Sequence, residues 1–262
     1  MLLSDGKEID MVSIGQMTAL IIAIVLPILI GAVPYYIFWK RSSKIETGML
    51  GALGYGIVGY LWEEIIYSFL GLLALTNLTG LLNATGGNAF FVAVVEALIS
   101  GAFVALGMYW GIYLTNTKQR SIYRSATVGI GFGIGYTLLN YGFQMYYVVK
   151  INTGTYTGDA AAKDRILSTS PASLYVSSYR NVLMVLIFMG MAFLAGKYYL
   201  EKKRLVCFMV PLLAYVFIRF TDVILNAYLP QLAARIIVCI LLTALAVACL
   251  WFVRGEMQKP QN

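Results

Sequence analysis

Seven long apolar runs, separated by short polar segments, dominate the hydrophobic pattern of this chain. Each reaches the ~20 residues that a helix rising ~1.5 Å per residue needs to cross a hydrocarbon layer ~30 Å thick. Because lipid offers the backbone no hydrogen-bond partners, each run is predicted to be a transmembrane helix. The runs extend over Met11 to Trp39, Gly48 to Leu75, Ala89 to Leu114, Thr127 to Val149, Leu174 to Ala195, Leu205 to Tyr228 and Leu232 to Phe252.

The composition points the same way. Of the 262 residues, 60% are hydrophobic and 12% are charged, whereas soluble domains average roughly 45–50% apolar and about 25% charged. So few polar side chains could not cover the surface of a water-soluble fold. We therefore predict an all-α integral membrane protein of the cell membrane, in which residues 1–262 form a single polytopic domain.

Basic residues in the connections predict the orientation, because Lys and Arg are retained in cytoplasmic loops. One alternating set of connections holds twelve of them and the other holds four. This predicts an outside N-terminus and a cytoplasmic C-terminus, with residues 150–173 as an outer loop that forms a short surface helix. The twelve are Lys40, Arg41, Lys44, Lys118, Arg120, Arg124, Lys197, Lys202, Lys203, Arg204, Arg254 and Lys259; the four are Lys7, Lys150, Lys163 and Arg165.

Other features of the composition exclude classes of function. The net charge of +7 gives no support to nucleic-acid binding, because in a membrane protein the position of each charge matters more than the total. The chain has no histidine, which removes the commonest general base and the usual neutral metal ligand. Cys207, Cys239 and Cys249 lie inside apolar runs without metal-ligand spacing and are interpreted as packing residues. We predict no cofactor and no metal.

Ionisable residues inside the apolar runs are the candidates for a functional site, because a charge in lipid needs a partner or a function. They are Glu63, Glu64, Glu96, Arg180, Arg219, Asp222 and Arg235. One interpretation is structural. Arg219 and Asp222, at i and i+3 of one helix, would pair with each other and with Arg180 or Glu96 of neighbouring helices.

The alternative interpretation is a polar cavity open to the outside. Glu63, Glu64 and Glu96 would line it and would bind a cationic group or relay protons. Adjacent Glu63 and Glu64 lie ~100° apart around a helix, so only one of them can point squarely into such a cavity. The candidate cavity therefore comprises Glu63, Glu64, Glu96, Arg180, Arg219 and Asp222.

Two clusters of glycine predict close helix packing, because small residues let helix backbones approach each other. No strand precedes either cluster, which excludes a nucleotide-binding loop. The clusters are Gly48, Gly51, Gly54, Gly56 and Gly59 in the second run and Gly129, Gly131, Gly133 and Gly135 in the fourth.

Three features of the first run carry a resemblance: the segment Met11 to Gly15, Pro27, and the ending Trp39 to Arg41. Together with the order of the later runs, they resemble the YhfC-like membrane proteins, which are relatives of the glutamate-dependent CAAX-type intramembrane proteases. The likeness covers most of the chain at the level of layout. It implies a bacterial plasma membrane protein with the scaffold of an intramembrane protease.

The first catalytic segment of that family is of the type Gly-x-Phe-Glu-Glu-x-x-Arg. It corresponds to Gly101 to Met108 of this sequence. Val104 and Ala105 then stand in the place of the glutamates, and Met108 in that of the arginine.

Two further segments of the family have also lost their polar groups here. A Gly-x-Gly-His-Gly-Gly-x-Glu segment corresponds to Gly129 to Tyr136, with Phe132 in the place of the histidine and Tyr136 in that of the glutamate. A late His-x-x-x-Asp pair falls on Ile218 and Asp222, of which only the aspartate is kept. The family chemistry needs a carboxylate and imidazoles to activate water or hold a metal, so the resemblance implies a pseudoenzyme.

The resemblance thus implies a non-catalytic, protease-like binding or assembly subunit, whose partners are membrane lipid and another membrane protein or a hydrophobic peptide. One alternative is a transporter, or a subunit of a transport complex, that uses Glu63, Glu64 and Glu96; the inverted repeats typical of transporters are not evident. A second alternative is an active intramembrane peptidase with a Glu63 and Glu64 dyad, one of them protonated by burial. The missing histidine argues against enzymatic activity.

Overall fold

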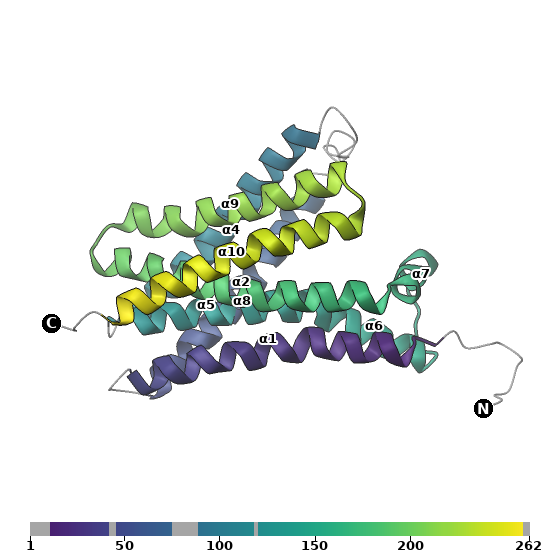
Figure 1. Cartoon of the computed structure of the whole chain (residues 1–262), viewed down its shortest axis with the longest axis horizontal. Coiled ribbons are helices and arrows are strands. Elements are labelled where there is room, and N and C mark those ends of the chain that lie inside the picture. The colour runs from purple at the N-terminus through teal and green to yellow at the C-terminus, as the bar shows by residue number, and fades with distance from the viewer. Residues whose placement is uncertain (1–10, 42–45, 75–88, 118–119, 259–262) are drawn as a thin grey trace, which may run out of the picture.

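The computed structural model describes residues 11–41, 46–74, 89–117 and 120–258, and within these ranges it contains helices and no strand. Figure 1 shows the helices running back and forth along one long axis. They are α1 (Ile14–Arg41), α2 (Glu46–Ala74), α4 (Ala89–Asn116), α5 (Ile122–Thr137), the π-helical turn η2 (Leu138–Gly142), α6 (Phe143–Asn152), α7 (Ala160–Ser168), α8 (Pro171–Leu200), α9 (Arg204–Tyr228) and α10 (Gln231–Met257).

Five helices of the described part are long and apolar enough to cross a membrane: α1, α4, α8, α9 and α10. The helix α2 is 29 residues long, and α5, η2 and α6 follow one another without a break. Within the described residues, each apolar run predicted from the sequence therefore coincides with helical segments. The prediction of an all-α fold is confirmed for the described residues, and the five long apolar helices are consistent with a membrane protein, whereas the number of spans and the orientation stay predictions.

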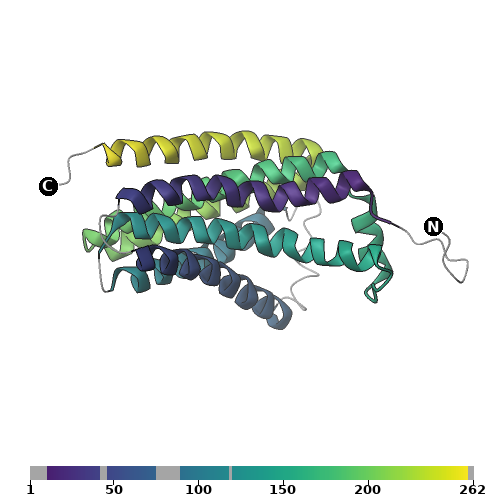
Figure 2. The ribbon, with the colours of Figure 1, turned by 90° about the horizontal axis from the view of Figure 1, so that it is seen from below.

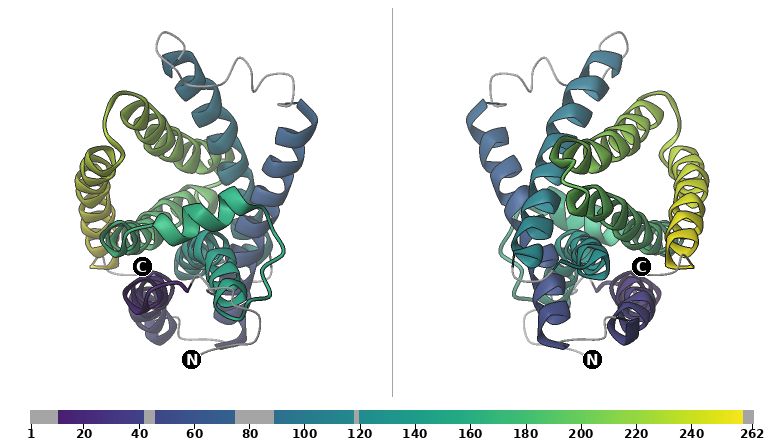
Figure 3. Two further views of the ribbon diagram at one scale, coloured as in Figure 1. Left: turned by 90° about the vertical axis from the view of Figure 1, so that its right-hand side faces the viewer. Right: turned by 90° about the vertical axis from the view of Figure 1, so that its left-hand side faces the viewer.

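The helix α5 lies in the interior of the bundle, packed between α2 and α8. Beyond these two neighbours, α4 packs against α2 and α9, and both α1 and α10 pack against α8. Figure 2 and the end-on views of Figure 3 place α10 on one flank of the bundle and α2 on the opposite flank. Nearly all residues of α5 are buried as a result.

Glycine explains how α5 fits between its two neighbours. A Cβ atom added at Gly131 would lie 2.1 Å from the Leu53 carbonyl oxygen of α2, and one at Gly129 would lie 2.2 Å from the Phe188 carbonyl oxygen of α8. No side chain fits at such distances, so the predicted role of these glycines in close packing is confirmed. Since Gly129 and Gly131 face opposite neighbours, the four alternating glycines of α5 serve both helix contacts.

The same prediction is wrong for two glycines of α2. A Cβ atom at Gly51 or Gly54 would meet no heavy atom within 4 Å, because this face of α2 is turned away from its neighbours. Gly56, in contrast, would place a Cβ atom 2.1 Å from the Val128 carbonyl oxygen of α5. Only one face of the glycine cluster in α2 therefore packs against another helix.

The long connection between α6 and α8 contains the predicted short helix, α7. Asp159 caps its N-terminus, since the Asp159 carboxylate accepts a hydrogen bond from the Ala161 backbone N–H at 3.3 Å. The side chain of Gln16, near the start of α1, donates a hydrogen bond to the Leu167 carbonyl oxygen at 2.9 Å. This contact holds α7 against the N-terminal end of α1.

Candidate functional site

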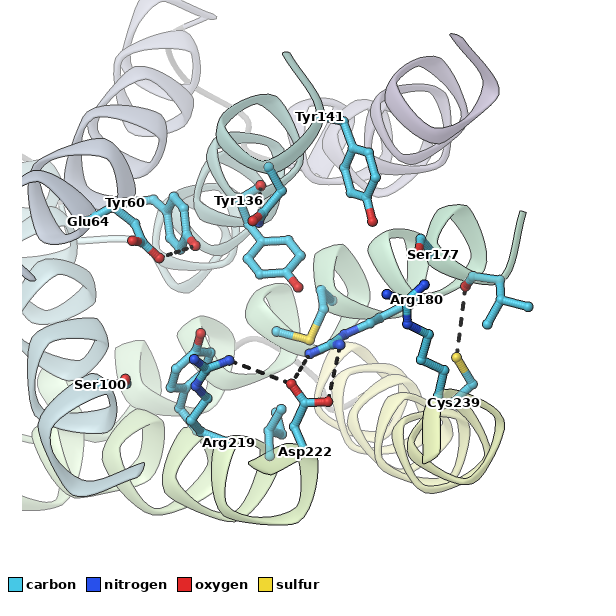
Figure 4. Close-up of a pocket in the computed structure, with 16 residues that line it drawn as sticks. Tyr60, Glu64, Ser100, Tyr136, Tyr141, Ser177, Arg180, Arg219, Asp222 and Cys239 are labelled. Carbon is cyan, nitrogen blue, oxygen red and sulfur yellow. Dashed lines mark hydrogen bonds and ion pairs between the residues drawn. The ribbon is translucent and has the colours of Figure 1, made fainter. Parts of the chain in front are cut away.

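A polar cavity of about 370 Å³ lies among the helices of the bundle. Its walls come from α2, α4, α5, η2, α8, α9 and α10, and Figure 4 shows the side chains that line it. The charged residues among them are Glu64, Arg180, Arg219, Asp222 and Arg235. Hydroxyl groups come from Tyr60, Ser100, Tyr136, Tyr141, Ser177 and Tyr215.

Asp222 of α9 holds two arginines in one wall of the cavity. Its carboxylate accepts hydrogen bonds from Arg180 Nη2 at 2.9 Å and Arg180 Nη1 at 3.3 Å. Arg219 Nη1 lies 3.6 Å from the same carboxylate, and Arg219 Nη2 donates to Glu96 of α4. Asn226, one turn later, donates a further hydrogen bond to Asp222 Oδ1 at 3.2 Å.

This network confirms the pairing that the sequence predicted for these four residues. It joins α4, α8 and α9 through groups that lie among apolar helices. Two-point hydrogen bonding between guanidinium and carboxylate is the strongest form of such a pair, and removing one member of a buried pair is costly because it leaves the other unpaired. The network therefore stabilises the packing of α4, α8 and α9 and also forms part of the cavity wall.

Glu64 of α2 stands apart from this network. Its carboxylate accepts a hydrogen bond from the Tyr60 hydroxyl at 2.8 Å, one turn earlier on the same helix. Figure 4 shows Glu64 and Tyr60 on one side, Arg180 and Asp222 on the other, and the Tyr136 ring between them. The cavity thus has an acidic wall on α2 and a largely basic wall on α8, α9 and α10.

The three glutamates of the predicted acidic site differ in their positions. Glu64 lines the cavity, whereas Glu96 contacts Arg219, which itself lines the cavity. The side chain of Glu63 lies outside the described residues. The transport alternative needs three acids in one cavity, and the described residues place one of them there.

The π-helical turn η2 supplies part of the wall that sequence reasoning missed. Asn140 and Tyr141, both within this turn, line the cavity together with Tyr136 at the end of α5. The side chain of Asn140 donates a hydrogen bond to the Tyr136 carbonyl oxygen at 2.8 Å. Single π turns inside α-helices occur frequently at functional sites. The polar residues Asn140 and Tyr141 inside an apolar run were the available signal.

Three groups in the cavity wall have unused bonding capacity. Arg235 donates to the Ser173 hydroxyl, and no carboxylate of the described residues lies within 4.0 Å of it. Likewise, no cationic group of the described residues lies within 4.0 Å of Glu64. The Nε atom of Arg180 is buried without a hydrogen-bond partner. One cation and one anion without opposite-charge partners thus share a single cavity.

The positions where the resemblance implies lost catalytic groups lie next to the cavity. Val104, Met108, Phe132 and Ile218 all belong to one buried apolar cluster, against which Tyr136 packs. Ala105 is fully buried as well. The cluster shares Ile218 with the cavity wall, so the apolar and the polar halves of the interior meet there.

Among the described residues, no three Cys, Asp or Glu side chains lie together as a metal site would need. The three cysteines are free, with Cys207 and Cys239 buried and Cys249 half-buried. Their interpretation as packing residues agrees with this burial, although Cys239 also lines the cavity. Comparison with known protein families, curated proteins and solved structures found no match for the chain.

Proposed function

We propose that this protein is a non-catalytic membrane binding or assembly subunit, which holds the polar group of a membrane-resident ligand in its cavity. The observation that carries the proposal is a charged cavity of about 370 Å³ among apolar helices, in which Arg235 and Glu64 have no partner of opposite charge among the described residues. Ionisable residues among membrane-spanning helices are rare, and those without an internal partner indicate a ligand or ion site. A polar group of a lipid or of a hydrophobic peptide would supply partners for Arg235 and Glu64.

We further propose a pseudoprotease scaffold. Val104, Phe132 and Ile218 come from three different helices and meet in one buried cluster, as the catalytic groups of a protease-like ancestor would have to meet. The Phe132 ring packs 5.3 Å from Tyr60 and 5.4 Å from Phe188, measured between ring centroids. Aromatic packing of this kind fills the space that water and a metal would need, and it supports binding without hydrolysis.

Seven spans, with the N-terminus outside and the C-terminus in the cytoplasm, complete the proposal. The ends of three helices that carry basic residues lie together at the end of the bundle opposite α7 (Figure 1). Arg41 of α1 donates to the Met257 carbonyl oxygen of α10 at 3.2 Å, and Lys197 of α8 forms an ion pair with Glu256 of α10 at 3.1 Å. One basic end of this kind supports a cytoplasmic face there.

Native mass spectrometry of the protein purified in mild detergent tests the binding function. We expect a stoichiometric lipid or peptide on the wild type and its loss from Ser177→Trp, because the indole would fill the cavity. Tyr175→Trp is the matched control, since Tyr175 lies on the same helix but is exposed on its outer face. A wild type without any retained molecule would overturn the proposal. So would peptide-bond cleavage by the pure protein that Glu64→Gln abolishes.

A further inference from the structure

We infer that the ligand of this cavity is a zwitterion, whose anionic group binds Arg235 and Arg180 and whose ammonium group binds Glu64. This inference rests on the function proposed above and specifies the chemistry of the ligand. It follows from two charges of opposite sign in one cavity, neither of which has an ionic partner among the described residues, and from the way in which each is presented.

The anion-binding side is formed by α8 and α10. The bond from Arg235 to the Ser173 hydroxyl joins these two helices. Arg180 donates from both terminal nitrogens to Asp222, and its buried Nε–H has no hydrogen-bond partner among the described residues. A guanidinium group carries five N–H donors in a planar fork, so Arg235 retains donors for a phosphate or carboxylate. Arg180 Nε can add another.

The cation-binding side is formed by α2. The Tyr60 hydroxyl donates to Glu64 Oε1 at 2.8 Å, which orients the carboxylate and leaves the second oxygen, Oε2, free of any bond to the described residues. An ammonium group has three donors and no acceptor, and it matches a carboxylate presented in this way. Tyr136 and Ser100, also in the wall, add hydroxyl groups for the rest of a polar ligand.

Electrostatics favours both charges on one ligand. A purely anionic ligand would satisfy Arg235 but would add repulsion to an unpaired Glu64 carboxylate. A purely cationic ligand would satisfy Glu64 but would add repulsion to Arg235. A buried charge without a partner of opposite sign is costly, as a general rule for buried ions. A zwitterion compensates both without changing the net charge of the cavity.

The size of the cavity restricts the ligand further. About 370 Å³ lies at the lower end of the roughly 300–1,000 Å³ typical of small-molecule pockets. This volume suits a phosphoethanolamine group or a small amino acid. The same chemistry can arrive as the head group of an aminophospholipid or as a free soluble zwitterion.

Lipid competition tests the inference. The delipidated protein is mixed with equal amounts of phosphatidylethanolamine and phosphatidylglycerol with the same acyl chains, and native mass spectrometry counts the bound lipids. We expect a preference for phosphatidylethanolamine of ~10-fold in the wild type, in line with the effect of one complementary buried charge. Glu64→Gln should abolish this preference, and Arg235→Gln should weaken binding of both lipids.

Controls and a soluble probe make the test decisive. Glu201→Gln and Arg254→Gln change exposed residues that do not line the cavity, and they should leave lipid binding unchanged. Glu64→Asp keeps the carboxylate and should keep part of the preference, which separates a lost charge from a misfolded chain. Glycerophosphoethanolamine that displaces the lipid at similar concentration indicates that the head group alone is recognised; failure to displace it assigns the ligand to the lipid.

The outcomes separate the two proposals. Equal or stronger binding of phosphatidylglycerol to the wild type, still blocked by Ser177→Trp, overturns the zwitterion and leaves the binding function intact. A preference that survives Glu64→Gln also overturns it. Absence of any lipid or soluble ligand from the wild type and all variants overturns both.

Discussion

The interior has an apolar half around α5 and a polar half around the cavity. The two are built from the same helices but differ in polarity and in packing. Around α5, glycines bring backbones into contact and fully buried side chains, among them Phe132 and Met108, form an apolar cluster. Where α5 passes into η2, the helix changes its hydrogen-bonding pattern and hydroxyl, carboxylate and guanidinium groups surround a cavity. Rigid packing on one side thus positions charges on the other.

The packed half should be the more sensitive of the two to substitution. Gly131→Leu places a branched side chain against the backbone of α2, where a Cβ atom alone would lie 2.1 Å from Leu53 O. We expect a loss of about 3 kcal/mol or more in the free energy of unfolding, through overpacking. Gly51→Leu is the matched control, since no heavy atom lies within 4 Å of its added Cβ. Equal melting temperatures for the two variants in detergent would contradict this prediction.

Within the charged half, Asp222 should matter most, because its carboxylate is the partner of both Arg180 and Arg219. Asp222→Ala leaves two guanidinium groups without it, and we expect a loss of about 2–4 kcal/mol in the free energy of unfolding. The double variant Arg180→Ala/Asp222→Ala should lose less than the sum of the two single changes. Thermal unfolding measures all three, and strict additivity would show that the pair contributes no coupling.

Glu96 should have a smaller effect, because its side chain and that of Arg219 are about one quarter and one third exposed (25% and 35%). Asp222 still holds Arg219 when Glu96 is neutralised. We expect Glu96→Gln to cost about 1 kcal/mol in the free energy of unfolding. A cost as large as that of Asp222→Ala would show instead that Glu96 is the principal partner of Arg219.

The connection between α8 and α9 should be least sensitive. A hydrogen bond from Lys203 at 2.8 Å lowers the pKa of the exposed Glu201 carboxyl. A lowered pKa stabilises the folded chain above the ordinary pKa of glutamate and loses that effect as the pH falls through the lowered value. Because solvent screens this pair, Lys203→Gln should raise the pKa of Glu201, seen by NMR titration, without a measurable change in melting temperature.

The features that the sequence could predict are those set by local spacing. Apolar runs located the helices within a few residues, and the i, i+3 spacing of Arg219 and Asp222 indicated their shared helix face. The cavity itself depends on rotations that no local pattern determines. Glu64 lines it because of how α2 is turned, and Arg235 joins it because α10 packs against α8.

The sequence did not predict the π turn or the hydroxyl groups of the cavity wall, for a related reason. Asn140 and Tyr141 lie in an apolar run whose hydrophobicity predicts a plain α-helix, and tyrosine is so frequent in this chain that single positions carry little signal. Gly51 and Gly54 show the opposite error, since a glycine can be recognised from the sequence but the helix face it occupies cannot.

A density map of the protein purified from its membrane, without added lipid, tests the central claim most directly. We predict a bound molecule inside the cavity, with one end at Arg235 and Arg180 and the other at Glu64. An empty cavity in which these side chains contact one another would contradict the claim that the cavity holds a ligand.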